Sequence, residues 1–526
     1  MPKLLMVIFT ENSSLGASML CNLAQEYGWI VDIYFVPPKE GSTQLELYIG
    51  QYKPDLIAFS FKSFERKQAF SVAGKIRKVV DIKMIAGGIH PTLMPDEVVQ
   101  TGFFDAVTVG DGMGIFEDIL DNYQNFNDDI LWGKPNSNKK LYSKYFYSKT
   151  QIKRMKSTET CSILSAIGCP FQCRFCHSGS DKFQVLPIED VALQVLELYN
   201  KYGVRCYHFV DDLFACNMKR LQKFRHIIEQ SCPDFSISSQ VSGKPSTFTK
   251  AIAEELVKLG VETMNFGVET ASPRLLKFLN KDQTVEDCYR AVQICHEFGL
   301  NCVINLMFGI PTQDENDYKE TLEFVKISQP DSVTCFFYSP YPGTELYDYC
   351  FDNYYLPDTF DRNRFDWFNP AIDGISDIQL RLNNVDYDLA MKYLEKTKQV
   401  TNRDTVLFER MNLVDTHPWV LVGTTRHYYF KTILKHLSAM NWKNCLGYIN
   451  TDAETGFQLE EDGIELLPIY NDKIVPFWCV THSFLGADFA IIEKYAKKRF
   501  HEEMPLISIS SFKRSHSVED IKKYQL

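Results

Sequence analysis

Short apolar runs alternate with amphipathic stretches over the first 120 residues of the chain. The runs have the length of buried strands, and the stretches between them have the period of a helix, a pattern typical of a parallel α/β sheet covered on both faces. The predicted strands are residues 4–9, 31–35, 55–60, 83–86 and 106–109. In such a Rossmann-like sheet, ligands bind beyond the carboxyl ends of the strands, so we expect the following loops to line a site.

The same alternation returns between residues 159 and 350, after a polar, Asn- and Lys-rich stretch at 126–158 that we predict to be a linker. The strands predicted in this second region are 162–166, 206–210, 236–240, 263–268, 302–308 and 332–338. Six β/α units of this length predict an open, partial (β/α)6 TIM-type barrel.

The remaining residues predict an extension and a third unit. Residues 351–414 combine an aromatic loop with an amphipathic helix near 387–400. Residues 415–526 predict a small α/β domain, with strands at 419–422, 445–449, 465–469, 477–480 and 506–509 and helices at 429–440 and 489–500. Its loop at 423–426 lacks the G-x-G-x-x-G spacing of a nucleotide site, which favours a docking role.

Composition narrows the class of protein. The chain has 526 residues, 45% of them hydrophobic and 23% charged, which is typical of several globular domains. A net charge of −11 disfavours binding to nucleic acids, and no apolar run is long enough to span a membrane. Fifteen cysteines without a secretion signal predict a reducing, cytoplasmic location, where clustered thiols bind metal more often than they pair.

Three of these cysteines stand together: Cys169, Cys173 and Cys176 have the spacing C-x3-C-x2-C. Three thiolates this close can bind one inorganic centre. A zinc site would need a fourth ligand, and His177 is badly placed for it because it follows Cys176 directly. A [4Fe-4S] cluster held by three cysteines leaves one iron open to another ligand. Zinc and a trio of structural thiols are the alternatives.

This loop, with Phe175 between its last two cysteines, resembles the signature of the radical S-adenosylmethionine (SAM) superfamily. The resemblance implies that the three cysteines hold a [4Fe-4S] cluster whose open iron binds SAM, and that Phe175 lies against the adenine. It extends along the barrel, where Asp211, Gln240 and Glu269 stand at the ends of the second, third and fourth predicted strands and are expected to contact SAM. Many relatives carry arginine where this chain has Gln240. A helix cap for Asp211 and a salt bridge for Glu269 are the structural alternatives.

The first region, residues 1–125, resembles the cobalamin-binding domain that precedes the barrel in one radical SAM class. Paired glycines at a strand end would let a flat ring lie on the backbone. The stretch equivalent to the cobalt-ligating Asp-x-His-x-x-Gly motif, residues 11–16, has no histidine, so the resemblance implies base-off cobalamin without a histidine ligand. A Rossmann-like domain without this ligand is the alternative. The expected contacts are Ser60, Gly87, Gly88, His90, Pro91, Thr92, Gly110 and Asp111.

These resemblances imply a cobalamin-dependent radical SAM methyltransferase. In that class a methyl group passes from SAM, by way of methylcobalamin, to an unactivated carbon of a substrate radical made by the 5′-deoxyadenosyl radical. Cyclisation or rearrangement without methyl transfer, and a non-catalytic cobalamin sensor, are the alternatives. The substrate could be a peptide or protein side chain, a lipid precursor or a natural-product intermediate. The expected electron donor is a flavodoxin or ferredoxin.

Overall fold

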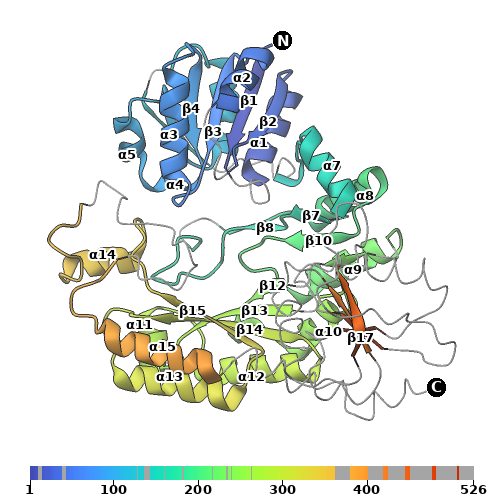
Figure 1. Cartoon of the computed structure of the whole chain (residues 1–526), viewed down its shortest axis with the longest axis vertical. Coiled ribbons are helices and arrows are strands. Elements are labelled where there is room, and N and C mark those ends of the chain that lie inside the picture. The colour runs from blue at the N-terminus through green and yellow to red at the C-terminus, as the bar shows by residue number, and fades with distance from the viewer. Residues whose placement is uncertain are drawn as a thin grey trace.

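The computed structural model shows four parallel sheets and one short antiparallel pair of strands, with two of the parallel sheets in the second region (Figure 1). It describes residues 1–400 except 10–14, 38–42, 127, 135–141, 159, 180–182, 216, 233–234, 238–239, 262 and 362–379. Beyond residue 400 it describes four strands. None of the described helices is long and apolar enough to cross a membrane.

The first sheet has six parallel strands in the order β2-β1-β3-β4-β5-β6. All five predicted strands are present. The sixth strand, β6, lies inside the predicted linker, where a four-residue run pairs with β5. The elements are β1 (Lys3–Ile8), α1 (Leu15–Glu26), β2 (Ile30–Phe35), α2 (Thr43–Tyr52), β3 (Leu56–Ser60), α3 (Arg66–Arg77), β4 (Lys83–Gly87), α4 (Ile89–Leu93), α5 (Pro95–Gln100), β5 (Ala106–Gly110), α6 (Phe116–Asp121) and β6 (Ile130–Gly133).

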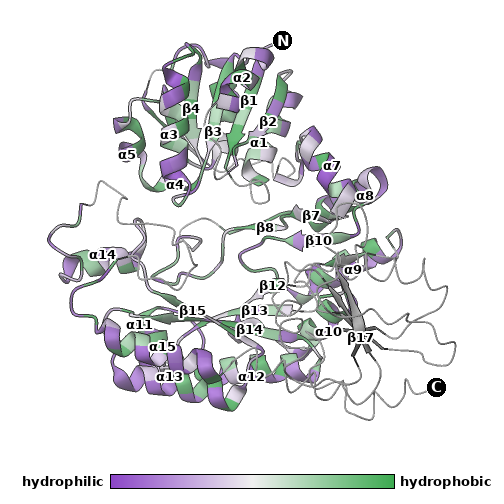
Figure 2. Cartoon of the chain, in the orientation of Figure 1, coloured by the Kyte–Doolittle hydropathy of each residue, from purple (hydrophilic) through white to green (hydrophobic). Residues whose placement is uncertain are grey.

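Burial explains the apolar runs of the central strands β1, β3 and β4, whereas the edge strand β2 is only partly buried and contains Asp32. Helices cover the sheet, so the apolar strands are flanked by amphipathic helices (Figure 2). α3, for example, buries Ala69, Val72, Ala73 and Ile76, which share one face of the helix at the expected spacing. The exposed residues of α3, which are Lys67, Ser71 and Lys75, are all polar, as the sequence pattern predicts.

The second region forms the predicted six-stranded series. Its third strand is split: β11 pairs with β10, and β12 pairs with β13. Both parts of the series are parallel, in the orders β11-β10-β7 and β12-β13-β14-β15. The strands are β7 (Thr160–Ile163), β10 (Cys206–Phe209), β11 (Ser236–Ile237), β12 (Gln240–Gly243), β13 (Thr263–Glu269), β14 (Asn301–Phe308) and β15 (Ser332–Phe337).

Helices follow the barrel strands, and local caps set where several of them begin. Thr284 with Asp287, and Asp314 with Asp317, form capping boxes at the starts of α12 and α13. The helices from the linker onward are α7 (Lys149–Thr158), α8 (Ile188–Tyr202), α9 (Met218–Glu229), α10 (Lys250–Lys258), α11 (Pro273–Phe278), α12 (Val285–Glu297), α13 (Glu315–Ser328), α14 (Glu345–Asp352) and α15 (Tyr387–Val400).

The last sheet is parallel, with the order β17-β16-β18-β19. Its strands match four of the five predicted ones: β16 (Trp419–Gly423), β17 (Cys445–Asn450), β18 (Phe477–Val480) and β19 (Leu506–Ser508). The predicted strand at 465–469, both predicted helices and loop residues 424–426 lie outside the described residues.

Candidate functional site

The three predicted metal ligands lie in a compact loop between the short strands β8 (Ala166–Ile167) and β9 (Gln184–Val185). The Cys176 N–H donates to the carbonyl of Cys173 at 3.0 Å, and all three cysteines are half-buried. Among the described residues, no three His, Cys, Asp or Glu side chains are placed to hold a single metal ion. In a [4Fe-4S] cluster each thiolate binds a different iron, so such a cluster does not require that convergence.

Two lysines that the sequence analysis missed lie beside this loop. The Lys244 ammonium is 3.2 Å from the centre of the Phe171 ring and 3.2 Å from an oxygen of Asp282. The Lys281 ammonium is 3.0 Å from Glu269 and 5.4 Å from the centre of the Phe175 ring. Both lysines are buried.

The lysines act electrostatically on the cysteines. Burial raises the pKa of the Cys173 thiol, while Lys281 and Lys244 oppose that rise because they favour the thiolate. Burial would lower the pKa of Lys281, but Glu269 and Cys173 reverse the effect, so its pKa is raised and it stays charged. Half-buried thiols with two ammonium groups beside them fit the negative charge of a thiolate-bound cluster.

Glu269, the last residue of β13, is buried and has a positive φ of 65°. The strand register shifts between Gly267 and Glu269, which turns the carboxylate back over the strand. A Cβ at Gly267 would lie 2.5 Å from that carboxylate and 2.9 Å from the Lys281 ammonium. The Glu269–Lys281 pair therefore depends on this glycine.

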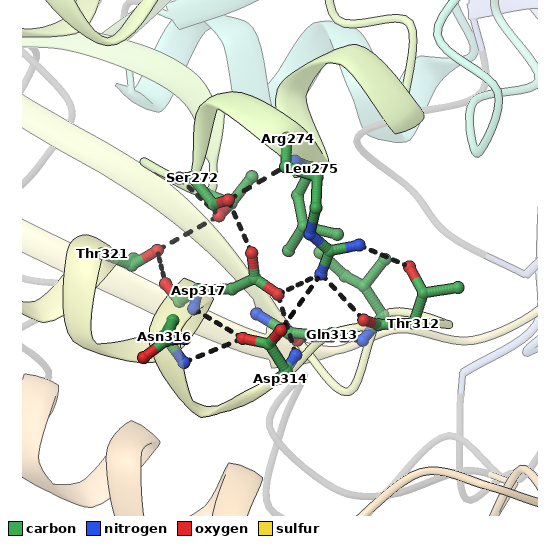
Figure 3. Close-up of polar contacts among 11 residues, drawn as sticks. Ser272, Arg274, Leu275, Thr312, Gln313, Asp314, Asn316, Asp317 and Thr321 are labelled. Carbon is green, nitrogen blue, oxygen red and sulfur yellow. Dashed lines mark hydrogen bonds and ion pairs between the residues drawn. The ribbon is translucent and has the colours of Figure 1, made fainter.

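A polar network holds the loop that follows Glu269 (Figure 3). Ser272 donates to the buried Asp317 at 2.6 Å, and Arg274 pairs with the same carboxylate. Arg274 also donates to the carbonyl of Thr312 at 2.8 Å. Thr312 has a positive φ of 70°, which is unusual for a β-branched residue. The network thus ties the loops that follow β13 and β14 to the first turn of α13.

The other predicted SAM contacts have different positions. Phe175 is half-buried beside Lys281. Asp211 is buried, and its carboxylate accepts from the Ser165 N–H at 3.0 Å and hydroxyl at 2.8 Å, which ties the end of β10 to the segment before the cysteines. Burial raises the pKa of Asp211 to about 6. The placement of Gln240 at the end of the third strand was wrong, because Gln240 begins β12 and Lys244 follows its end.

Several of the predicted cobalamin contacts lie together at the carboxyl ends of β3, β4 and β5 in the first sheet. Ser60 and Gly87 are register partners on β3 and β4, and the Gly110 N–H donates to the Thr92 hydroxyl at 3.1 Å. Gly88 and Gly110 are exposed, and the side chain of Ile89 is 51% exposed. This end of the sheet, with two exposed glycines and an exposed isoleucine, fits the apolar face of a large flat ring.

The physical reason for the paired glycines differs from the expected one. A Cβ at Gly87 would lie 2.5 Å from the Thr108 hydroxyl oxygen. A Cβ at Gly88, whose φ is +101°, would lie 2.9 Å from the carbonyl oxygen of Phe61. Contacts within the domain therefore already require glycine at both positions.

The remaining residues of this set face inward. His90 and Pro91 are buried, and the His90 ring lies 3.3 Å from both Ser63 and Glu97. The Asp111 carboxylate accepts from the Met113 N–H at 2.9 Å and from the Tyr142 hydroxyl at 2.5 Å. The side chains of His90 and Asp111 therefore serve contacts within the protein.

The two predicted sites meet at a small junction. Leu93 and Met94, at the end of α4 in the first domain, pack with Tyr341 from the loop after β15. A Cβ at Gly343 would lie 3.7 Å from Leu93 and 3.8 Å from the ring of His177, the residue after the last cysteine of the motif. The loop after β15 therefore lies beside both the first domain and the end of the cysteine motif.

Comparison with known proteins matches both regions. Residues 3–120 match the B12 binding domain, and residues 163–325 match the radical SAM superfamily. An uncharacterized methyltransferase of Pyrococcus horikoshii is 26% identical, covering 66% of this chain and 80% of that protein. An anaerobic magnesium-protoporphyrin IX monomethyl ester cyclase of Cereibacter sphaeroides is 21% identical, covering 67% of this chain and 62% of that protein.

A solved structure supports the same fold. The radical SAM methyltransferase TsrM from Kitasatospora setae superposes with a TM-score of 0.58 at 16% identity, covering 69% of this chain and 79% of that one. The two matched domains imply a [4Fe-4S] cluster, SAM and cobalamin as cofactors. The chain is therefore an enzyme of the radical SAM superfamily that carries a B12 binding domain ahead of its radical SAM domain.

Proposed function

We propose that this enzyme transfers a methyl group from SAM to an unactivated carbon of its substrate. The observation that carries the proposal is the position of Gly343, in the loop after β15, which lies beside both Leu93 of the B12 domain and His177 at the end of the cysteine motif. When bound, the cluster supplies the electron that cleaves SAM, and cobalamin carries the methyl group. Residues of both domains would therefore contribute to one active site, with the cysteine loop holding the cluster and the B12 domain holding cobalamin.

The chain's own residues would bind and orient SAM. Its methionine part carries an ammonium and a carboxylate group, and the buried Glu269–Lys281 pair offers the opposite charges 3.0 Å apart. Cys169, Cys173 and Cys176 would hold the cluster. Phe175 and Phe171, each beside a lysine, would cover the bound molecule and exclude water.

The cobalamin would be base-off, with no histidine ligand from the B12 domain. His90 is the only histidine among the first 125 residues, and its buried ring is engaged by Ser63 and Glu97. Ser60, Gly88, Thr92 and Gly110 would form the contact edge. A flavodoxin or ferredoxin would supply the electrons that this superfamily requires.

The test needs no knowledge of the substrate. The reconstituted enzyme, with cluster, cobalamin, SAM and a reductant, is expected to release both S-adenosylhomocysteine, which marks loss of the methyl group, and 5′-deoxyadenosine, which marks radical cleavage. Chromatography of the nucleoside products measures both. Release of neither would refute the proposal and favour a non-catalytic sensor.

Ring closure is a second candidate, because the cyclase of Cereibacter sphaeroides matches 67% of the chain. A cyclase would release 5′-deoxyadenosine without S-adenosylhomocysteine. Once a substrate is found, SAM with a deuterated methyl group distinguishes the two reactions: a methyltransferase adds the labelled methyl to the product, whereas a cyclase removes hydrogen and adds nothing.

A further inference from the structure

Arg174 lies inside the cysteine motif, between Cys173 and Cys176, and makes contacts in two directions. Toward the end of α11, its N–H donates to the carbonyl of Leu279 at 3.0 Å, and its guanidinium donates to the carbonyl of Phe278 at 3.2 Å. The guanidinium carbon also lies 5.0 Å from the centre of the Phe278 ring.

The second direction is toward α14. The Arg174 carbonyl accepts the Leu346 N–H at 2.7 Å, and its guanidinium lies 2.8 Å from the Glu345 carboxylate. The guanidinium carbon is also 5.3 Å from the centre of the Tyr349 ring. Arg174 thus bonds to one of the backbone N–H groups in the first turn of α14, which have no partner within the helix.

The turn after α11 adds a further bond to the cysteine loop. The Asn280 side-chain amide donates to the carbonyl of Gln172 at 2.7 Å, and Asn280 has a positive φ of 51°. The next residue is Lys281, whose ammonium pairs with Glu269. Two residues of the cysteine motif, Gln172 and Arg174, are therefore bonded to the turn that carries Lys281.

We propose that Arg174 is a positioning residue that fixes the cysteine loop against the turn at 278–281, and so sets the separation between the cysteines and the Glu269–Lys281 pair. The inference rests on the proposed function, because SAM bound to the open iron of a cluster would have to reach that pair. Arg174 would act through the loop it holds, without touching SAM. Glutamine in its place cannot reproduce the carbonyl bond and both ring contacts together.

The first experiment uses the full-length protein without cofactors. Hydrogen exchange, read by mass spectrometry, should be at least about tenfold faster in R174Q than in wild type for peptides covering residues 169–179 and 278–282. Arg205→Gln is the matched control, because Arg205 also combines a tyrosine ring contact, at 3.9 Å, with bonds to backbone carbonyls but lies in the turn between α8 and β10. It should leave both peptides unchanged.

The second experiment uses the cluster-loaded enzyme. SAM affinity, measured by the change that SAM produces in the paramagnetic resonance spectrum of the reduced cluster, should fall about tenfold in R174Q. It should recover in part in R174K, which keeps the charge. Glu345→Gln should change it less, because Glu345 is 65% exposed and its ion pair is screened by solvent.

The outcomes separate the two proposals. Wild-type exchange in cofactor-free R174Q, or wild-type SAM affinity in the loaded variant, would overturn the role of Arg174. If loaded wild type neither binds nor cleaves SAM, the proposed function fails, while the exchange experiment still tests the link between the two segments. Loss of iron from R174Q together with faster exchange would support the link, whereas loss of iron with unchanged exchange would refute it.

Discussion

The buried pair of Glu269 and Lys281 makes a quantitative prediction about the barrel. Their side chains are only 9% and 11% exposed, with 3.0 Å between the charged atoms. Lys281→Met keeps the apolar stem of the side chain but leaves a buried carboxylate without its cation. Removing one partner of a buried ion pair costs about 3–5 kcal/mol. Replacing both, in E269Q/K281M, should cost less than K281M alone because no uncompensated charge remains.

The assay must report on the barrel itself. No tryptophan lies between residues 159 and 350, so tryptophan fluorescence would follow other parts of the chain. Hydrogen exchange of peptides from β13 and α12 in cofactor-free protein gives the local free energy of opening. Lys277→Met is the matched control, since Lys277 is exposed on the neighbouring α11, and it should change that free energy by less than about 0.5 kcal/mol.

SAM binding gives the second measurement on the same variants. Loss of a hydrogen bond to a charged group costs about 1.5–3 kcal/mol, so K281M in the loaded enzyme should bind SAM roughly 10- to 150-fold more weakly. If K281M destabilises β13 by less than about 1 kcal/mol, or if E269Q/K281M costs the sum of E269Q and K281M, the two side chains are not energetically coupled. Unchanged SAM affinity would remove the pair from the proposed binding site.

Three further predictions concern other contacts. Asp317→Ala should destabilise the barrel by about 2–4 kcal/mol, because a helix cap and a buried hydrogen bond from Ser272 are lost together. Urea unfolding followed by circular dichroism measures this, and the control Glu323→Ala, on the exposed side of α13, should not destabilise the barrel. The folded-state pKa of Asp211 is raised to about 6, so its contribution to stability is lost as pH rises from about 4 to 6. The stability of wild type relative to Asp211→Asn should therefore fall by about 2–3 kcal/mol between pH 4 and 7. A difference that does not change with pH would contradict the raised pKa. Gly88→Ala should lower the melting temperature of the B12 domain more than Gly102→Ala, because both have positive φ but only the first Cβ meets a backbone atom; equal effects would mean that strain alone matters.

Local pattern in the sequence was enough for the architecture. Buried parallel strands need continuous apolar runs, so the runs in the first 350 residues marked all the strands described there except the short β6, β8 and β9. That strand has too few residues for a pattern and depends on the free edge of β5. The three cysteines could be read as one site because all their ligand atoms come from one stretch of eight residues.

The surroundings of those cysteines could not be read in the same way. Lys244 and Lys281 stand in segments far from the cysteines in the sequence, and each looks like an ordinary surface residue in its own segment. Asp211 and His90 show the reverse: each stands where a ligand contact is expected, yet each side chain bonds within the protein.

The sequence by itself therefore determined where the strands of the first two α/β regions lie along the chain, and the chemistry of the thiolate loop, because periodicity and close spacing are local properties. Only the tertiary structure decided which charges face that loop, why the glycines at the sheet edge are required, and where the two sites meet. Those features depend on strand register and on the path of the loops after each strand. A contact between two distant segments cannot be recognised from the sequence of either segment alone.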